Sequence, residues 1–423
     1  MVRDVVITGL GAFTSLGDSM QETFNRCLRG EGAIRQASPE LCKWHPAAIT
    51  AHIDRDFSSL LAPAERGFDR ATQLALVASR EAMTDSGLEL DEDQRANAGV
   101  YCGIGLGGAT TLESVYTRFY HRLFKINGET GDPTVVHPFT VTNTMPNAAA
   151  SWISIFNGLK GPTQTYSVAC ASSAVAVGEA WRAIRHGYVE SAVVVGTEAM
   201  LAAGPYLAWH ALRVMAPGDA QDIAASCRPF SRDRRGFVLG EGAAAMVLET
   251  RERARKRGRA PYATLAGYGI SSDATHITMP DSHGQARAIA MALKESRLAP
   301  ERIGYINAHG TATQAGDLSE TTAIKQVFGE HAQRLRISST KAMHGHVIGA
   351  GGTLEFGIAV KALHQGVVPP TAYLREPDPA LDLDYVAGGP VEIPGLSAVM
   401  SNSFAFGGTN VSLIATHEAG RDG

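Results

Sequence analysis

Short runs of apolar residues, each closed by glycine or by a small polar residue, recur along the whole chain. Apolar runs of about four to eight residues between turn residues are typical of strands that are buried on both faces. The pattern predicts strands at Val5–Thr8, Ala98–Gly105, Gln164–Cys170, Ser191–Gly196, Ala243–Leu248, Ala263–Gly269, Tyr305–His309, Ile337–Thr340 and Ala398–Ser401.

Between these strands, apolar residues return at every third or fourth position, which is the spacing of a helix with one buried face. This spacing predicts helices at Thr72–Ser86, Ala174–Gly187, Gly284–Ser296, Ser319–Phe328 and Thr353–His364. Because strands and helices alternate, we expect an α/β fold with mostly parallel sheets. The second half of the chain repeats the plan of the first, which indicates a duplicated unit with halves at residues 1–254 and 255–423.

The composition is that of a globular protein with a large core. Apolar types make up 44% of the 423 residues and charged types 19%, which argues against disorder. With 38 basic and 42 acidic side chains, the net charge of −4 offers no overall attraction to nucleic acid. We interpret the basic stretch Arg251–Arg259, near the junction of the halves, as a solvated surface helix.

The sequence also bears on the compartment. It contains no uninterrupted apolar run of about 18 residues, so we expect no membrane span. Arg3 and Asp4 lead directly into the first predicted strand, so we expect no signal peptide. Five cysteines without a C-x-x-C pair predict neither a disulfide framework nor a zinc-ribbon site. These features favour a cytoplasmic protein.

Gly9-Leu10-Gly11 follows the first predicted strand and imitates the start of a dinucleotide-binding loop. The third glycine of the G-x-G-x-x-G pattern is missing, and no acidic residue ends a second strand about 20 residues further on. We therefore interpret these glycines as a tight turn. A nicotinamide-dependent oxidoreductase is the less favoured alternative.

Cys170 lies between a predicted strand and a predicted helix, among the small residues Ala169, Ala171, Ser172 and Ser173. A sulfur at a helix start is close to unpaired backbone N–H groups, which stabilise the reactive thiolate. The small neighbours leave room for a substrate. Taken alone, the pattern fits a nucleophile and a buried inert cysteine equally well.

Two histidines lie at or after the ends of predicted strands in the second half. His309 precedes Thr311 and Thr313, whose hydroxyl groups could bind a substrate arm that carries amides; a structural histidine in a polar loop is the alternative. His346 comes five residues after Lys341 and leads into a glycine-rich helix start.

Two further patterns allow more than one interpretation. A metal site on His344 and His346 lacks a third ligand nearby in the sequence. The segment Ser401–Asn410 leaves a strand through a glycine turn. Its backbone N–H groups could stabilise an oxyanion, or the segment could be a plain hairpin turn.

In this order, these motifs resemble those of the β-ketoacyl-[acyl-carrier-protein] synthases of the KAS I/II type, which are condensing enzymes of the thiolase superfamily. The resemblance runs over essentially the whole chain, from Val5–Gly11 to Asn410–Ala415. It includes the segments Arg228–Ala243 and Val367–Thr371, both typical of the family.

The resemblance implies a thiolase-like, five-layered αβαβα fold made of two duplicated halves. It implies a decarboxylative Claisen condensation between an acyl group on the cysteine and malonyl-ACP, in fatty-acid or polyketide and polyene chain elongation. Substrates would be carried on the phosphopantetheine of acyl carrier protein, with no metal or redox cofactor. The chain would form a homodimer, or a heterodimer with a related ketosynthase-like subunit.

The resemblance also implies roles for individual residues. The catalytic set would be the nucleophile Cys170, the pair His309 and His346 for decarboxylation, and Lys341 to orient the second histidine. The backbone N–H groups of Cys170 and Phe406 would form the oxyanion hole, within a gate at Phe404, Ala405 and Phe406. The substrate-binding set would be Thr311 and Thr313 for the pantetheine arm, the nearby carboxylate Glu355, and Leu106 and Trp209 for the acyl chain. Core packing accounts equally well for Trp209.

The sequence departs from the family pattern at two positions. The gating turn usually reads Phe-Gly-Phe-Gly, whereas Ala405 stands between the phenylalanines here. If this position needs a positive φ in either gate state, alanine would bias the gate. His344 occupies a position where a small or neutral residue is common. Both variants resemble condensing enzymes of specialised pathways, such as polyketide, nodulation-factor or polyene lipid synthesis.

Acyl carrier protein is acidic, so its docking face should be locally basic. Arg66, Arg70 and Arg213 are candidates by position, whereas the basic contacts expected after Phe124–Lys125 are not evident in Gly128–Val136.

Two other functions compete with a condensing enzyme. A thiolase shares the fold but usually carries a second catalytic cysteine near the C-terminus, and no cysteine follows Cys227 here. A non-catalytic subunit of the chain-length-factor type would not need Cys170, His309 and His346.

Overall fold

The computed structural model describes residues 2–123 and 136–417, and its centre is a ten-stranded mixed sheet. Strands β1 (Val5–Thr14), β4 (Ala98–Gly103), β5 (Thr163–Tyr166), β6 (Ser191–Glu198) and β7 (Gly242–Thr250) form one unit of it. Strands β8 (Ala263–Ser272), β9 (Tyr305–Asn307), β10 (Arg336–Ser338), β13 (Ala398–Phe404) and β14 (Thr409–Thr416) form the other. The units meet where β1 and β8 pair through Val6 with Thr264 and Ile7 with Ala263.

The two units have the same internal topology. The strand order is β1-β7-β6-β4-β5 in the first and β8-β14-β13-β9-β10 in the second. In both, the outer pairs are parallel and the pairs nearest the junction are antiparallel. The expectation of mostly parallel sheets was therefore wrong. An apolar run that is buried on both faces looks the same in either kind of pairing, so the pattern could not reveal the direction of the strands.

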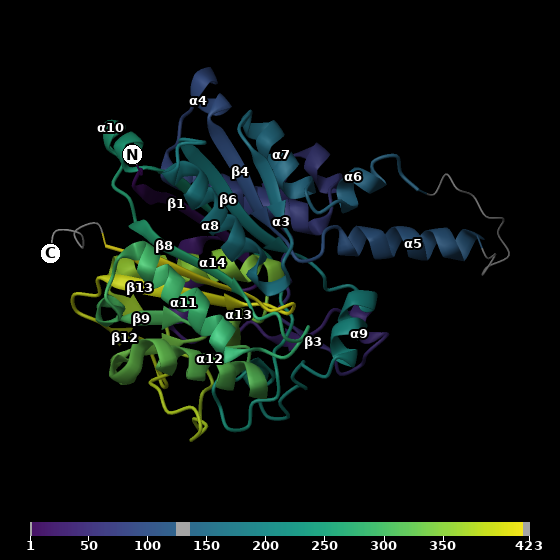
Figure 1. Ribbon diagram of the computed structural model, residues 1–423. Helices are drawn as coiled ribbons and strands as arrows, with labels where there is room; N and C mark the ends of the chain where they lie inside the picture. Colours follow the sequence, from purple (N-terminus) through teal and green to yellow (C-terminus); the bar gives the residue numbers. More distant parts are fainter. Residues whose placement is uncertain (1, 124–135, 418–423) are drawn as a thin grey trace.

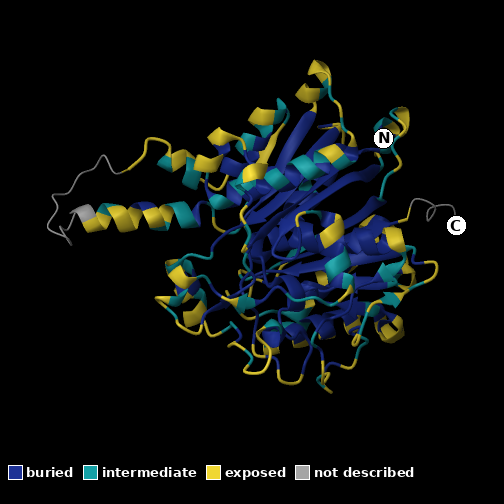
Figure 2. Cartoon of the chain, turned by 180° about the vertical axis from the view of Figure 1, so that it is seen from behind, coloured by how far each residue is buried: buried dark blue, intermediate teal, exposed yellow. Residues whose placement is uncertain are grey.

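Helices complete five layers, αβαβα, as expected (Figure 1). Helices α3 (Arg70–Ser86) and α7 (Ala148–Asn157) pack on the outer face of the first unit, and α11 (Ser282–Ser296) and α12 (Gln314–Phe328) cover the second. Helices α8 (Ser172–Arg185) and α14 (Gly351–Gln365) contact each other between the units. Both central helices are almost entirely buried, whereas exposed residues gather on the outer helices and loops (Figure 2).

Strand β1 extends through the glycines for which a turn was predicted. It continues to Thr14 and pairs with β7 along its length. A Cβ atom on Gly9 would lie 2.1 Å from the carbonyl oxygen of Ala82, and one on Gly11 would lie 2.2 Å from that of Ala78. These glycines therefore let α3 approach the strand closely. The strand–turn–helix of a dinucleotide-binding loop is absent at this place.

The remaining helices lie at the surface, apart from the fully buried α13. They are α1 (Met20–Leu28), α2 (Pro39–Cys42), α4 (Glu92–Ala96), α5 (Ala109–Leu123), α6 (Thr140–Thr144), α9 (Ala203–Ala211), α10 (Arg251–Lys256) and α13 (Lys341–His344). Two small antiparallel sheets, β2 (Arg35–Gln36) with β3 (Ile49–Thr50) and β11 (Val367–Val368) with β12 (Val391–Glu392), complete the fold. The basic stretch forms the surface helix α10, where Arg253 and Arg257 pair with Glu249.

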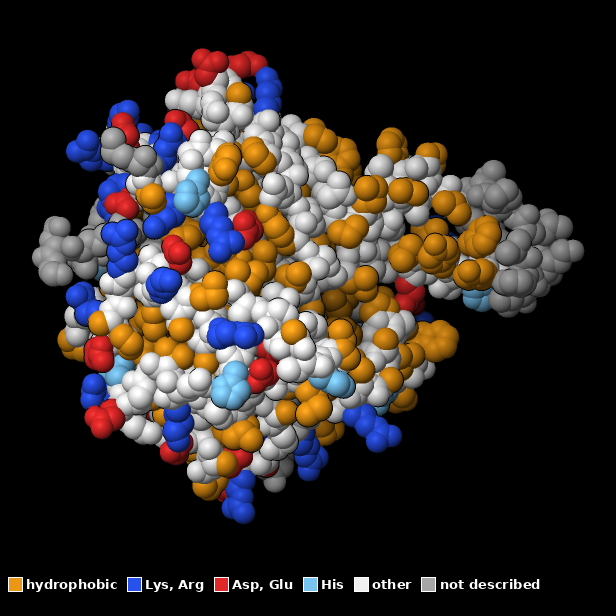
Figure 3. All heavy atoms as spheres, in the orientation of Figure 1, with side chains coloured by type: hydrophobic (Ala, Val, Ile, Leu, Met, Phe, Trp, Pro, Cys, Tyr) orange, Lys and Arg blue, Asp and Glu red, His pale blue; other side chains and the backbone are white. Residues whose placement is uncertain are grey.

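Helix α5 projects from the body of the molecule (Figure 1). Tyr116 and Tyr120 on this helix are exposed. Hydrophobic side chains gather over the projecting helix on this side of the molecule (Figure 3). Among residues 2–123 and 136–417, no helix has both the length and the apolar character needed to cross a bilayer.

Candidate active site

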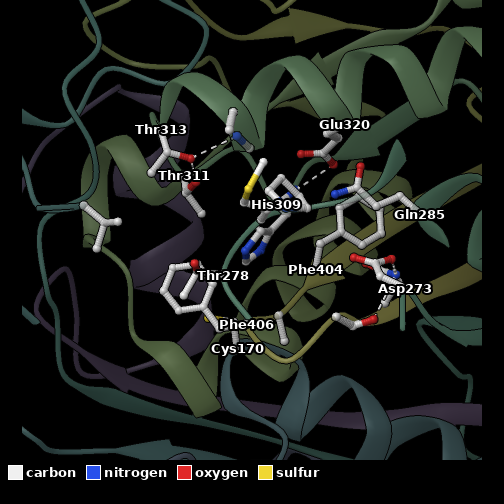
Figure 4. Close-up of a pocket in the computed structure, with 18 of the residues that line it drawn as sticks. Cys170, Asp273, Thr278, Gln285, His309, Thr311, Thr313, Glu320, Phe404 and Phe406 are labelled. Atoms are coloured by element: carbon white, nitrogen blue, oxygen red, sulfur yellow. Dashed lines mark hydrogen bonds between the residues drawn. The ribbon is translucent and has the colours of Figure 1, made fainter. Parts of the chain in front are cut away.

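Cys170 lies in a single 3₁₀ turn, Ala169–Ala171, between β5 and α8. The predicted strand over this residue ends earlier, at Tyr166. Ala169 has a φ of +49°, which is uncommon outside glycine and makes the chain turn sharply just before the cysteine. The Ser172 hydroxyl fastens this turn, since it accepts from the Val168 N–H at 2.9 Å and donates to the Ala169 carbonyl at 2.6 Å. The turn places Cys170 on the wall of a cavity that extends to the exposed side chains of Ile277 and Met279 (Figure 4).

Two histidines from the second half of the chain lie close to the Cys170 sulfur. His309 follows β9, and His346 follows β10 and α13. His346 Nε2 lies 3.0 Å from Cys170 Sγ, and the two imidazole rings are nearly perpendicular with centroids 5.5 Å apart. One ligand atom from each of the three side chains lies within 4.8 Å of the other two. The three residues that the sequence pointed to separately are therefore neighbours, and all are buried.

The hydrogen bonds of His346 fix the place of its proton. Its Nδ1 accepts the backbone N–H of Ile348 at 3.3 Å. Burial, helped by the charge of Lys341, holds the pKa of both His309 and His346 well below the usual value of a histidine, so both rings are neutral. A neutral ring that accepts at Nδ1 carries its proton on Nε2, so His346 donates to the Cys170 sulfur.

The Cys170 thiol is subject to opposing influences. Burial is the largest and raises its pKa to about 12, while the charge of Lys341 and the N–H of Phe406 lower it. The expectation that the helix start would hold a thiolate in the resting protein is therefore not supported, because the sulfur is desolvated. Once a substrate promotes loss of the thiol proton, the Nε2–H of His346 and the N–H of Phe406 stabilise the Cys170 thiolate.

Alkylation of Cys170 by iodoacetamide should accordingly rise about tenfold per pH unit between roughly pH 7 and 10, because only the thiolate reacts and its fraction grows until the pH reaches the pKa. The labelled peptide can be quantified by mass spectrometry, with the Cys170→Ala variant as the blank. A rate that levels off below about pH 8 would show that the thiol ionises near neutrality and would contradict this prediction.

Lys341 forms a buried ion pair with Glu355 on α14. Its Nζ lies 2.6 Å from Glu355 Oε1, and each side chain is 1% exposed. Burial raises the pKa of Glu355 to about 7, and Lys341 opposes this shift. The contact that the structure shows for Lys341 is with Glu355 rather than with His346, so the lysine acts on the histidines through its charge. Glu355 is not on the cavity wall.

The cavity beside the cysteine encloses about 160 Å³. Cys170, His309 and His346 line this cavity (Figure 4). Its wall also includes Phe404, Ala405, Phe406, Trp209, Phe237, Thr311 and Thr313. The hydroxyl groups of Thr311 and Thr313 are 2.9 Å apart. Phe406 stacks on Trp209 with ring centroids 5.9 Å apart. Leu106, by contrast, is 45% exposed and is not part of this wall.

The glycine turn after β13 adopts its conformation without strain at Ala405. The positive φ values fall at Gly407 (+89°) and Gly408 (+77°), whereas Ala405 has none. In this conformation alanine therefore bears no backbone penalty. His344 is fully buried, and its ring contacts the Gly345 carbonyl at 2.7 Å and the Thr340 hydroxyl at 2.9 Å.

Glu320 on α12 was not found from the sequence. Its carboxylate accepts the backbone N–H groups of His309 at 2.9 Å and Gly310 at 2.8 Å, and the side-chain amide of Asn402 at 3.1 Å. It thereby fixes the loop that carries the first histidine. An acidic residue in a helix eleven positions after a histidine is too common a pattern to have indicated this contact.

Of the three arginines predicted to bind acyl carrier protein, two are exposed and one is held in an ion pair. Arg66 and Arg213 are exposed. Arg70 binds the buried carboxylate of Glu241 with both Nε and Nη2 at 2.7 Å, so it is not free to bind a partner in the way the sequence suggested. Apart from Val136, the segment Gly128–Val136 lies outside the described residues.

The duplicated αβαβα fold, with a cysteine of the first half facing two histidines of the second, defines a thiolase-like ketosynthase. The sequence profile described as "Beta-ketoacyl synthase, N-terminal domain" matches residues 2–254, and "Beta-ketoacyl synthase, C-terminal domain" matches residues 262–375. The chain therefore belongs to the β-ketoacyl synthase family.

Known relatives match over nearly their full length. The 3-oxoacyl-[acyl-carrier-protein] synthase 2 of Synechocystis sp. is 38% identical, over 97% of this chain and 97% of that protein. Nodulation protein E of Rhizobium leguminosarum bv. trifolii is 40% identical, over 98% and 99%. A solved structure, "The ishigamide ketosynthase/chain length factor", is 29% identical with a TM-score of 0.89, over 99% of this chain and 100% of that one.

Proposed function

We propose that the chain is a β-ketoacyl-[acyl-carrier-protein] synthase that elongates an acyl chain by decarboxylative Claisen condensation. The observation that carries the proposal is the buried cluster in which His346 Nε2 lies 3.0 Å from Cys170 Sγ, with His309 beside it. This cluster places a nucleophile and two neutral hydrogen-bond donors around one small cavity.

In the first step, Cys170 Sγ attacks the carbonyl carbon of an acyl thioester on the carrier. The backbone N–H groups of Cys170 and Phe406 stabilise the oxyanion. The bond between the acyl carbon and the carrier sulfur then breaks, an acyl–Sγ bond remains, and the proton of the thiol leaves on the carrier thiol. Thr311 and Thr313 hold the pantetheine arm during this exchange.

In the second step, malonyl-ACP loses CO₂, and the electron pair of the broken C–C bond forms an enolate with negative charge on the thioester oxygen. His309 and His346 donate hydrogen bonds to that oxygen, and the desolvated cavity strengthens both bonds. The enolate carbon attacks the acyl carbonyl, a new C–C bond forms, and Cys170 leaves as a thiolate that regains a proton. The product is a β-ketoacyl chain on the carrier.

The other predicted residues surround this chemistry in the proposal. Lys341 and Glu355 set the electrostatic environment of the cysteine and histidines. Phe404, Ala405 and Phe406 form the gate, and Trp209 and Leu106 border the path of the acyl chain. No metal takes part: although the cluster could hold an ion, His346 turns a protonated nitrogen toward the sulfur, which suits donation rather than ligation. The substrates reach the site on phosphopantetheine.

The proposal includes a dimer. Strand β5 is the last strand of the sheet, and its residues Thr163 and Gln164 are exposed. An unpaired edge of this kind favours pairing with a second chain. Apolar side chains are also exposed on α7, which contacts β5, and on or beside α6 and α5 beyond it: Ile155, Phe156, Phe139, Val141, Tyr116 and Tyr120. The second chain would be a copy of this one or a related ketosynthase-like subunit. We also propose halves at residues 1–254 and 255–423, and a cytoplasmic location.

Intact-protein mass spectrometry tests the function. The purified chain is mixed with acyl-ACP donors of several lengths and then with malonyl-ACP. We expect a mass increment equal to the acyl group, its loss when malonyl-ACP is added, and release of β-ketoacyl-ACP. If no donor acylates the chain, even with a ketosynthase-like partner present, the proposal is wrong. The donor that reacts fastest identifies the acyl class.

A further inference from the structure

Ile348 has an unusual backbone beside the second histidine. Its φ of +40° lies in the left-handed region, which β-branched residues rarely adopt and which persists only where the surroundings hold it. The N–H of this same residue is the group that donates to His346 Nδ1 at 3.3 Å. The strained residue therefore determines where His346 keeps its proton.

Glu198, the last residue of β6, is the group best placed to hold this strain. Its side chain is fully buried. One carboxylate oxygen, Oε2, accepts the N–H of Gly349 at 3.0 Å and that of Gly105 at 2.8 Å, and Oε1 accepts the N–H of Leu106 at 3.2 Å. The carboxylate thus ties the segment after His346, in the second half, to the loop after β4, in the first half.

The two segments are in direct contact around this carboxylate. A Cβ atom on Gly349 would lie 2.2 Å from the Gly105 nitrogen. A Cβ atom on Gly105 would lie 2.5 Å from Glu198 Oε2 and 3.1 Å from Ile348 Cγ2. This packing leaves Gly349 no space on that side, so its N–H stays aimed at the carboxylate.

We propose that Glu198 is a positioning residue: by holding the Gly349 N–H it keeps Ile348 in the left-handed conformation and so keeps the His346 proton on Nε2. This inference rests on the proposed function. Without the carboxylate, Ile348 relaxes to negative φ and its N–H turns away from Nδ1. The proton of His346 is then free to occupy Nδ1. In that tautomer, Nε2 presents a lone pair to the enolate oxygen, which is repulsive.

The first test compares Glu198→Leu with Glu198→Gln in the decarboxylation of malonyl-ACP, measured as release of CO₂. The leucine variant should lose about 10²-fold in kcat, the size of a lost oxyanion donor, with a KM that changes less than about twofold. The glutamine variant should stay within about fivefold of wild type, because its carbonyl oxygen in the place of Oε2 accepts from both glycines and only the longer bond from the Leu106 N–H to Oε1 is lost.

A second pair of variants tests the hydrogen bond from the Ile348 N–H to His346 Nδ1 directly. Ile348→Pro lacks the N–H and fixes φ near −65°, whereas Ile348→Gly keeps the N–H and adopts positive φ freely. The proline variant should therefore decarboxylate about 10²-fold more slowly than the glycine variant. The matched control is Glu81→Gln, which alters a carboxylate that accepts two backbone N–H groups, from Ala12 and Met20, outside the cavity. Its kcat should equal that of wild type.

The outcomes separate the inference from the function on which it rests. If wild type neither becomes acylated nor decarboxylates malonyl-ACP, the proposed function fails. If wild type is active but Glu198→Leu matches its glutamine control and Ile348→Pro matches its glycine control, the positioning role is wrong and the function stands. If Glu198→Leu does not fold, the Ile348 pair decides.

Discussion

Replacing Cys170 by serine is expected to lower the formation of β-ketoacyl-ACP by about 10⁴-fold or more, because a hydroxyl ionises far less readily than a thiol and the covalent acyl intermediate is lost. Desolvation makes the difference larger, since the same burial that raises the pKa of the thiol opposes an alkoxide even more strongly. The measurement is the initial rate of product formation from acyl-ACP and malonyl-ACP, together with the mass of the protein, which should gain no acyl increment.

Decarboxylation provides the contrast that makes this prediction specific. The donors proposed for the enolate are His309 and His346, so Cys170→Ala should still release CO₂ from malonyl-ACP. His346→Ala should lower that release by about 10²- to 10³-fold, the usual cost of a lost oxyanion donor. Cys42→Ser, at a half-buried thiol outside the cavity, is the control for a general effect of losing a cysteine. If Cys170→Ala abolished decarboxylation and condensation equally, the division of roles would be wrong.

The sequence predicted the site residues that stand at the ends of strands and the helices that have a regular apolar pattern. Cys170 and His309 stand at the ends of predicted strands and His346 follows another; because β9 and β10 are parallel neighbours, the chain leaves both strands at the same edge of the sheet, which brings the two histidines together. The five predicted helices correspond to α3, α8, α11, α12 and α14, and α11, for example, begins two residues before its predicted start at Gly284; α1, α5, α7 and α9 were not predicted. These features depend on local patterns of a few residues, which a single sequence contains.

What the sequence could not predict depends on contacts between distant segments. Glycines 9 and 11 looked like a turn, because the helix that needs their missing side chains lies about 70 residues further on. Glu198 and Glu320 bind backbone N–H groups, which every residue except proline offers, so no residue type marks their partners. The burial that raises the pKa of Cys170 is likewise a property of the assembled fold rather than of its neighbours in the chain.

Removal of the Lys341 side chain is expected to be the most destabilising change at the site. Lys341→Met leaves the Glu355 carboxyl group buried without its partner, and above its raised pKa, where the group is a carboxylate, breaking a buried pair in this way costs about 3–5 kcal/mol. The double variant Lys341→Met with Glu355→Leu replaces the pair by apolar side chains and should recover most of that loss, since well-packed apolar replacements are often neutral. Urea unfolding of the three proteins provides the free energies.

In the double variant, the condensation activity should stay low although the stability recovers. The charge of Lys341 lowers the pKa values of Cys170, His309 and His346, so its loss raises all three even when the double variant is fully stable. The alkylation profile of Cys170 should therefore move to higher pH than in wild type, and condensation at neutral pH should stay low. Glu355→Gln keeps the lysine charge and is the control, since its alkylation profile should not move upward. If the double variant regained both stability and wild-type condensation, Lys341 would be part of the scaffold only, and its charge would have no share in the chemistry.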